Sequence, residues 1–179
     1  MTNFDLNQIE WGEFYIGGLD GLFEISRGNA KNVTTRTKEG EVALISSKGI
    51  YNGFNFFTIP EPNEIIYENV ITINNNGSVG YAYYHPYKFI ATSDVTILRL
   101  KHQASMKSKL FLITILNKLQ EKYSYGYKMS DERLNRQILK LPIDCIGNIN
   151  WSFMESYIEM ELVKKKADYH RFIKGEFEK

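Results

Sequence analysis

Residues 141–173 read LPIDCIGNINWSFMESYIEMELVKKKADYHRFI, and this stretch decides the fold. Asn150 is a residue type favoured at helix N-caps, so we expect a helix to begin at Trp151. Apolar residues then recur three or four positions apart, which places them on one face of an α-helix. The residues that we expect to form this helix interface are Trp151, Met154, Ile158 and Leu162. Tyr169, Phe172 and Ile173 continue the stripe, so the sequence predicts a long amphipathic helix.

The residues before this helix predict the end of a buried strand. Gln137–Ile143 is an apolar run that contains Pro142, and proline is confined to the ends and edges of sheets. Gly147–Asn150 is polar and has the composition of a turn. We therefore expect a compact domain over residues 1–150 and a helical arm over residues 151–179.

The composition is that of an ordinary globular protein. The 179 residues are 43% hydrophobic and 24% charged, and the formal net charge is only +1. A nucleic-acid-binding face must therefore come from uneven placement of charge. Cys145 is the single cysteine, which excludes an internal disulfide and fits a reducing cytoplasm. Met1–Glu10 does not resemble a signal peptide, and the longest apolar run, Leu110–Leu116, is too short to span a bilayer, so no membrane is expected as a partner.

Short apolar and alternating segments predict a β-rich body before the C-terminal helix. These segments cover residues 11–16, 22–25, 41–46, 54–59, 65–73 and 95–100. Ser26–Asn32 is expected to be a polar, cationic loop, and Asn52-Gly53 is a strong turn signal. Gln103–Lys122 predicts one long helix in the body. Its expected core-facing residues are Met106, Leu110, Ile113 and either Leu116 or Asn117.

The sequence contains no recognisable catalytic or metal-binding motif. His85, His102 and His170 are separated from one another and from Cys145, so they predict neither a metal site nor a nucleophile with its base. A magnesium-dependent nuclease of the common type carries Asp-x-Lys or Glu-x-Lys, and neither occurs. A P-loop and the Pro-Pro pair of DNA methyltransferases are also absent. We therefore expect a binding module that is not an enzyme and uses no cofactor and no metal.

Three segments of the chain, in order, resemble one protein family. They are W-x-x-F-x-I-x-x-L…LF-x-I-x-x-G at residues 11–28, I-T-I-x-x-x-G-S-V-G-x-A-Y-Y-x-x-x-x-F-x-A-T-S-D-V at residues 71–95, and LP followed by W-x-F-M-x-x-Y-I at residues 141–158. With these motifs the chain is similar to the target recognition domains of type I restriction-modification specificity subunits and of the related BcgI-like specificity subunits. The resemblance covers about residues 11–158, which is most of the chain.

The resemblance implies an α+β fold, in which a curved mixed β-sheet core is packed with a few helices and followed by the long C-terminal helix. It also implies sequence-specific binding of double-stranded DNA, which directs a partner methyltransferase, and restriction subunits as well, to the target. Family members usually carry two recognition domains and two such helices, whereas this chain has one of each. It is therefore a half-subunit that forms a homodimer through residues 151–173, a fragment, or a domain that works beside a fused or separate methyltransferase. Lys164–Lys166 interrupts the apolar stripe, so dimerisation stays a hypothesis.

Loop position and side-chain chemistry select eight candidate DNA contacts. Arginine and lysine hold phosphates, whereas amides, hydroxyls and aromatic rings in loops contact base edges. The candidates are Arg27, Asn29, Lys31, Lys48, Asn52, Ser78, Tyr125 and Lys128. Each has a plainer alternative, because solvated hairpins, glycine-dependent turns and aromatic residues that pack over a helix end use the same residue types. Two other functions also stay open, a small nuclease with an unrecognised site and a protein–protein adaptor without DNA binding.

Overall fold

The computed structural model describes residues 4–123 and 129–175 of the chain. Its α-helices are α1 (Met106–Asn117), α2 (Asp131–Asn135) and α3 (Trp151–Ile173). Its strands are β1 (Trp11–Tyr15), β2 (Phe23–Arg27), β3 (Val42–Ile45), β4 (Phe54–Thr58), β5 (Val70–Asn74), β6 (Ala82–His85), β7 (Phe89–Ala91), β8 (Val95–Leu100) and β9 (Ile138–Pro142). Short 3-10 helices cover Leu6–Gln8, Tyr51–Gly53 and Lys118–Glu121. The mixed content and the long C-terminal helix confirm the expected α+β fold class.

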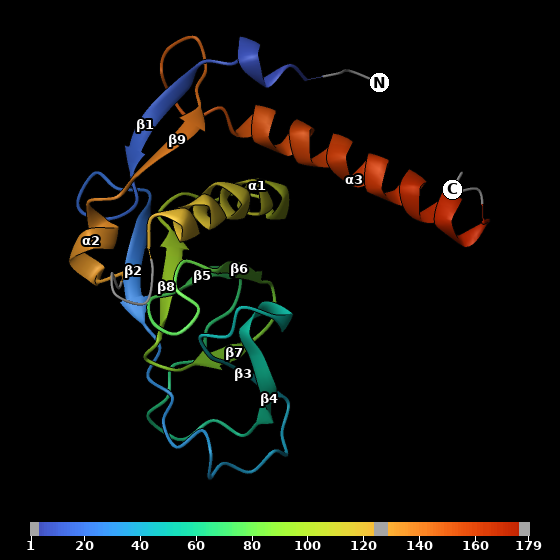
Figure 1. The fold of residues 1–179 in the computed structure, drawn as a ribbon. Coiled ribbons are helices and arrows are strands. Elements are labelled where there is room, and N and C mark those ends of the chain that lie inside the picture. Colours follow the sequence, from blue (N-terminus) through green and yellow to red (C-terminus); the bar gives the residue numbers. More distant parts are fainter. Residues whose placement is uncertain (1–3, 124–128, 176–179) are drawn as a thin grey trace.

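The strands form three sheets rather than one continuous sheet (Figure 1). β1 and β9 make an antiparallel two-stranded ribbon, in which Trp11 lies opposite Pro142. An antiparallel sheet has the strand order β2-β8-β5-β6, and a smaller mixed sheet has the order β4-β3-β7, with β3 and β7 parallel. The strand that the sequence predicted to end at Pro142 is β9, so that prediction is confirmed. Its pairing with β1 joins the first strand of the body to the last.

The largest hydrophobic core includes residues of the four-stranded sheet, of α1 and of the first half of α3. Phe111, Leu112 and Leu116 of α1 are buried in it together with Met154 and Ile158 of α3. Figure 1 shows α1 between this sheet and α3, and it shows the C-terminal half of α3 extending beyond the body. The core therefore anchors the beginning of α3 and leaves its end projecting.

The helix α3 begins where the sequence predicted. Asn150 Oδ1 accepts a hydrogen bond from the Phe153 N–H at 2.9 Å. This bond satisfies one of the N–H groups that have no partner inside the first helical turn. The loop before it is closed by Gly147, whose N–H donates to the Asp144 carbonyl at 3.0 Å and whose φ is +86°. Local signals thus fix the point at which the chain turns from the ribbon into the arm.

The helix of the body is shorter than expected, and its buried face differs at two positions. Leu116 is buried and Leu110 and Ile113 pack against the core, as the sequence predicted. The α-helix spans Met106–Asn117 instead of Gln103–Lys122, and Met106 is 50% exposed rather than core-facing. Lys109 is buried instead, because its ammonium donates to Asn69 Oδ1 at 2.6 Å and to the Asn69 carbonyl at 3.3 Å. Since α1 packs against both α3 and β6, burial is not confined to one apolar stripe.

Two strand boundaries also differ from the expectation. Residues 65–73 were expected to be strand-like throughout, but β5 spans only Val70–Asn74. The reason lies at Asn69, whose φ of +57° breaks the extended conformation just before β5. At the other position, Arg27 belongs to β2 and pairs with Thr96 of β8, although Ser26–Asn32 was expected to be a loop. The polar side chains of Ser26 and Arg27 are compatible with a strand because both residues are exposed.

The three-stranded sheet has a smaller core of its own. Ala43, Ile45 and Phe89 are buried there, together with Val95 and Ile97 from β8. Figure 1 shows β3, β4 and β7 on the side of the four-stranded sheet that lies away from α3. The protein therefore has an upper body that carries the arm and a lower lobe built on the small sheet.

Candidate nucleic-acid interface

Two loops lie side by side where the lower lobe meets the four-stranded sheet. Residues 46–53 join β3 to β4, and residues 75–81 join β5 to β6. The Ser78 N–H donates to the Ser47 carbonyl at 3.2 Å, which links the two loops directly. We call residues 46–53 and 75–81 together the two-loop surface. It brings Lys48, Asn52 and Ser78, three of the eight candidate residues, onto two neighbouring loops.

Lys48 is held mainly by its backbone, and its side chain makes one long hydrogen bond. Its carbonyl accepts one hydrogen bond from Asn74 Nδ2 at 3.0 Å and a second from the Tyr83 hydroxyl at 3.3 Å. Lys48 itself is exposed, and its ammonium lies 3.4 Å from the Phe54 carbonyl. The main chain is thus fixed at this position while the charge lies at the protein surface. This arrangement suits a contact with a phosphate group.

Glycines allow the two loops to approach closely. A Cβ atom on Gly77, whose φ is +62°, would lie 2.8 Å from Ser47 Oγ. A Cβ atom on Gly49 would lie 3.0 Å from Ser78 Oγ. The loops enclose a hollow of about 660 Å³, lined by residues 47–51 of the first loop and by Gly77, Ser78 and Tyr81 of the second. Its lining therefore combines glycines, two serines and two tyrosines with Lys48 and Ile50.

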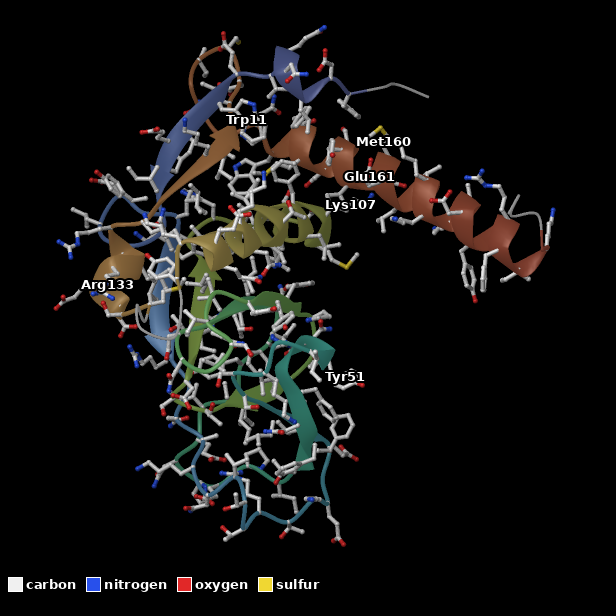
Figure 2. All side chains as sticks on the ribbon, viewed as in Figure 1. Trp11, Tyr51, Lys107, Arg133, Met160 and Glu161 are labelled. Carbon is white, nitrogen blue, oxygen red and sulfur yellow. The ribbon has the colours of Figure 1, made fainter. Side chains whose placement is uncertain are left out.

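The tip of the first loop is a short left-handed turn. Tyr51, Asn52 and Gly53 have φ values of 53°, 53° and 72°. Asn52 is exposed, as a base-contacting amide must be, and asparagine tolerates this conformation well. The predicted turn at Asn52-Gly53 is therefore confirmed. Tyr51, which the sequence analysis did not select, is 78% exposed beside it (Figure 2).

A second hollow lies on the other side of the second loop. It has a volume of about 260 Å³ and is lined by Arg27, Asn75, Asn76, Asp94, Met129 and Ser130. Asn76 Nδ2 donates to Asp94 Oδ1 at 3.0 Å. Arg27 Nε forms an ion pair with Asp131 at 2.9 Å, and both side chains are roughly half exposed. The charge of Arg27 is therefore already balanced by a carboxylate, which weakens Arg27 as a phosphate contact.

Asn29 and Lys31 belong to a different part of the lower lobe. Asn29 Nδ2 donates to the Asn63 carbonyl at 2.8 Å, and Asn29 Oδ1 accepts from the Ile65 N–H at 3.0 Å. The Lys31 N–H donates to Glu64 Oε1 at 3.3 Å, and this carboxylate also forms a buried ion pair with Arg36. Both residues therefore help to hold the loop before β5. Lys31 is exposed, whereas both polar atoms of the Asn29 amide are occupied within the protein.

The two remaining candidates, Tyr125 and Lys128, lie outside the described residues. Met129 and Ser130, which follow them, line the hollow beside Arg27. The sequence analysis missed Asn74 and Tyr83, whose contacts depend on the pairing of β5 with β6. It also missed Tyr51. The signal for Tyr51 was present, since an apolar Ile50-Tyr51 pair directly precedes the Asn-Gly turn.

Burial favours the neutral forms of two titratable groups near the two-loop surface, Tyr83 and His85. Burial raises the pKa of the Tyr83 phenol, and the neighbouring Tyr81 raises it further. Burial lowers the pKa of His85 to about 4, so its imidazole is uncharged at neutral pH. In the described residues, no group of three or more His, Cys, Asp or Glu side chains is placed to hold a metal ion. The surface therefore offers hydrogen bonds and the charge of Lys48, which are the chemistry of binding.

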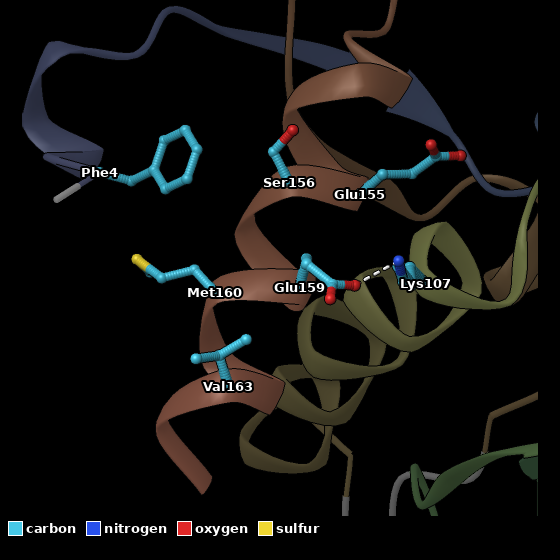
Figure 3. A pocket seen from close by; sticks show the side chains of 7 residues that line it. All are labelled: Phe4, Lys107, Glu155, Ser156, Glu159, Met160 and Val163. Carbon is cyan, nitrogen blue, oxygen red and sulfur yellow. Dashed lines mark ion pairs between the residues drawn. The ribbon is translucent and has the colours of Figure 1, made fainter. Parts of the chain in front are cut away.

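A third hollow lies on the upper body, along α3. It has a volume of about 520 Å³ and is lined by Phe4, Lys107, Glu155, Ser156, Glu159, Met160 and Val163 (Figure 3). An ion pair between Lys107 and Glu159 joins α1 to α3 beside this hollow (Figure 3).

Within residues 4–123 and 129–175, no helix has the length and apolar character needed to cross a membrane.

The four residues that were predicted to form a helix interface pack against the core of this chain. Met154 is 0% exposed and Ile158 is 8% exposed, and both lie in the core of this chain. Trp151 and Leu162 are half-buried and pack against the same core. These four residues therefore attach α3 to its own body, because the first half of the helix lies on α1. A partner helix must use other residues of the arm.

The chain and its fold belong to a known class of protein. Residues 10–168 match the family model of the type I restriction modification DNA specificity domain, and the chain belongs to this family. The match covers nearly all of the body and most of α3. It confirms the resemblance that the three sequence segments indicated.

Particular members of the family are similar over only part of their length. The chain is 33% identical over 154 residues to the specificity subunit of the type II restriction enzyme BcgI from Heyndrickxia coagulans, which is 86% of this chain and 44% of the relative. The S subunit of a type I restriction-modification system from M. genitalium has a similar fold, with a TM-score of 0.66 and 17% identity over 91% of this chain and 41% of that one. The HsdS subunit from Thermoanaerobacter tengcongensis gives a TM-score of 0.59 and 15% identity over 88% of this chain and 38% of that subunit. The chain thus spans less than half the length of these proteins.

Proposed function

We propose that this chain is the sequence-specific DNA-recognition component of a restriction-modification system. One observation carries the proposal: in a chain of the DNA specificity family, two hydrogen-bonded loops present Lys48, Asn52 and Ser78 on one surface. The loops are joined by the hydrogen bond between Ser47 and Ser78, and they expose polar side chains together with Ile50 and Tyr51. Such a surface can enter a groove of the duplex without a large change of structure.

The proposed mechanism is direct readout of the bases. Contacts with phosphates position a protein on DNA, whereas contacts with base edges specify the sequence. We assign the first role to Lys48 and the second to Asn52 and Ser78, since an asparagine amide pairs with adenine and a serine hydroxyl with several bases. Arg27 and Asn29 stay candidates of lower weight because their side chains have protein partners. Lys31 stays a candidate as well, since its bond to Glu64 comes from the backbone N–H and its side chain is exposed. Tyr125 and Lys128 also stay candidates.

The chain is proposed to catalyse no reaction itself. A partner methyltransferase, and restriction subunits where present, would supply catalysis at the site that this chain selects. The proposed location is the cytoplasm, where the DNA and these partners are found. With a net charge of +1, the isolated chain has little electrostatic attraction to DNA, so we expect the partner to contribute much of the affinity.

The arm is proposed to dock on another helix. We assign residues 1–150 to DNA recognition and residues 151–179 to the arm, with the first half of α3 seated on the body. The exposed apolar residues of its second half are Val163, Tyr169, Phe172 and Ile173. A homodimer would place two such arms together by two-fold symmetry and supply two recognition surfaces. The same residues would serve if the second helix comes from elsewhere in a longer protein.

Selection of binding sites from a randomised duplex pool tests the proposed recognition. The full chain is used alone and together with its methyltransferase subunit. We expect enrichment of a short defined motif, with an affinity that falls steeply as the salt concentration rises. Failure to enrich any motif in both formats would exclude DNA recognition and leave the adaptor function.

Light scattering on a sizing column tests the homodimer. We expect the wild-type chain to dimerise as its concentration rises, and a Tyr169→Ser/Phe172→Ser variant to stay monomeric. Leu19→Ser is the matched control, because Leu19 is 94% exposed in the turn between β1 and β2, away from the arm. A wild-type chain that is monomeric at high concentration contradicts the homodimer and leaves docking on a different partner.

A further inference from the structure

One residue of the two-loop surface has a backbone conformation that its side chain disfavours. Four non-glycine residues among those described have positive φ, namely Asn32, Tyr51, Asn52 and Asn69. Asparagine adopts this conformation readily, whereas a bulky side chain such as tyrosine rarely does. Strained residues of this kind persist where the surrounding structure holds them, and they are frequent at functional sites. Tyr51 is thus the residue of this group that calls for a functional explanation.

Hydrogen bonds hold the strained turn at its base. The Gly53 N–H donates to the Ile50 carbonyl at 3.0 Å, and the Ser46 N–H donates to the Gly53 carbonyl at 2.9 Å. Asn55 Nδ2 adds a bond to Ser46 Oγ at 3.0 Å. The turn is therefore closed before any ligand arrives, and a tyrosine presented on it loses little side-chain freedom on binding.

The turn exposes two apolar side chains together. Ile50 is 61% exposed and Tyr51 is 78% exposed, and both line the hollow that also contains Lys48 and Ser78. A pair of exposed apolar side chains is unfavourable in water and becomes favourable when a partner covers it. The partner must also suit the adjacent lysine ammonium and serine hydroxyl. A nucleic acid meets both requirements, since its bases are apolar on their faces and its backbone carries the phosphates.

A second exposed apolar patch on the lower lobe has a different character. It surrounds a hollow of about 450 Å³ lined by Glu41, Ala43, Phe54, Phe57, Tyr87 and Lys88. Glu41 lines that hollow and would repel a phosphate, and its charge also offsets that of Lys88, the one cation in the lining. The hollow beside Tyr51 has no acidic residue among those that line it. Electrostatics therefore favours the Tyr51 side as the one that meets DNA.

We propose that Ile50 and Tyr51 form an apolar wedge that contacts the bases of the target and contributes to its specificity. This inference rests on the proposed function and assigns it two residues that the sequence analysis did not select. Lys48 would hold a phosphate next to the wedge. The contact takes one of two forms: packing against a thymine methyl group in the major groove, or insertion between two stacked bases.

The test compares the specificity ratio of variants, which is the affinity for the selected motif divided by the affinity for a random duplex. The full chain, with its methyltransferase subunit where binding requires it, is used as wild type, Ile50→Ser/Tyr51→Ser and Lys48→Gln. Ile146→Ser is the matched control, because Ile146 is also 78% exposed but lies in the loop between β9 and α3. Salt dependence is measured for each protein. Duplexes with thymine replaced by uracil, or with 2-aminopurine in the motif, distinguish the two forms of contact.

We expect the double variant to lose roughly tenfold or more of the specificity ratio while its salt dependence stays unchanged. Lys48→Gln should instead weaken binding to both duplexes and lower the salt slope by about one. A double variant that keeps its specificity ratio within about twofold of wild type overturns the wedge and leaves the proposed function standing. A double variant that keeps this ratio but no longer assembles with the methyltransferase shows that the wedge binds protein, which also overturns the inference. A wild-type protein without any sequence preference overturns both the wedge and the proposed function.

Discussion

The arm and the two-loop surface are attached to the protein by different interactions. The first half of α3 is attached by apolar packing, in which Met154 and Ile158 fill the main core. The two loops are attached by polar contacts from Asn74 and between Ser47 and Ser78. Apolar packing supplies stability without demanding one exact geometry, whereas hydrogen bonds have narrow limits of distance and angle. The difference teaches that packing gives the attachment of the arm its stability, whereas hydrogen bonds fix the geometry of the two-loop surface.

The largest expected effect on the free energy of unfolding comes from weakening the apolar packing of α3 on the body. Met154→Ala removes a side chain that is 0% exposed and leaves a cavity between α3 and α1. We expect the free energy of unfolding to fall by about 2–5 kcal/mol, measured by denaturant unfolding. Tyr169→Ala, in the projecting half of the same helix, should change it by less than about 0.5 kcal/mol in dilute protein. Equal effects of the two variants would mean that the whole helix is packed on the body.

Acid should act at the joint between the upper body and the lower lobe. His85 ends β6, lies in contact with Phe89 of β7 and is bonded to Thr72 Oγ1 at 2.9 Å and to the Tyr87 hydroxyl at 3.1 Å. Burial lowers its pKa from 6.5 to about 4. Protonation therefore favours the unfolded chain, so the contribution is complete above pH 6.5 and is lost as the pH falls toward 4. The expected loss is about 3 kcal/mol over this range.

Unfolding by urea at a series of pH values measures this loss for wild type and His85→Gln. The variant should lack the part of the pH dependence that His85 causes, whereas His102→Gln, at an exposed position, should keep it. Hydrogen exchange at pH 5 would sharpen the comparison, because we expect amides of β7 to lose protection before those of α1. Identical pH profiles for wild type and His85→Gln would show that another group is responsible.

The polar attachment should respond to Asn74→Ala. Asn74 is buried, and its Nδ2 group holds the Lys48 carbonyl. We expect a loss of about 1–2 kcal/mol, because one hydrogen bond disappears and the carbonyl keeps only its bond from Tyr83. The clearer readout is local: hydrogen exchange at Ser78 should accelerate while exchange in α1 stays unchanged. Faster exchange throughout the protein would mean that Asn74 supports the whole core rather than the two loops.

The sequence predicted those features of the arm and of the two-loop surface that depend on neighbouring residues. The Asn150 cap, the strand ending at Pro142 and the Asn52-Gly53 turn are encoded by neighbouring residues, and all three are present. The same local reasoning placed Lys48 and Ser78 in loops, but it did not show that Ser47 and Ser78 are bonded to each other. That contact depends on how β3, β5 and β6 are arranged, which follows from packing between distant segments.

The errors have the same origin. On α1, Met106 was wrongly expected to face the core and the burial of Lys109 was not expected. The helix is covered on more than one side, and Lys109 is accommodated by Asn69, 40 residues earlier in the chain. Trp151 and Met154 were correctly placed on one apolar stripe, but periodicity does not tell whether a stripe faces its own body or a partner. The apolar Ile50-Tyr51 pair before the Asn-Gly turn was visible in the sequence, but the positive φ of Tyr51 was not, because that conformation depends on the hydrogen bonds of Ser46 and Gly53.

The smallest expected effect on stability is a gain. It most directly separates the free energy of unfolding from the specificity for DNA. Tyr51→Gly removes a bulky side chain from a residue with a φ of 53°, where glycine is not strained. We expect the protein to become more stable by roughly 0.5–1 kcal/mol, while Asn52→Gly, at the same φ, changes little because asparagine already tolerates it. Denaturant unfolding of both variants measures this difference. If Tyr51→Gly also lowers the specificity ratio for DNA, the strain is retained for reading the target; a more stable variant with full specificity would mean that the tyrosine is only tolerated there.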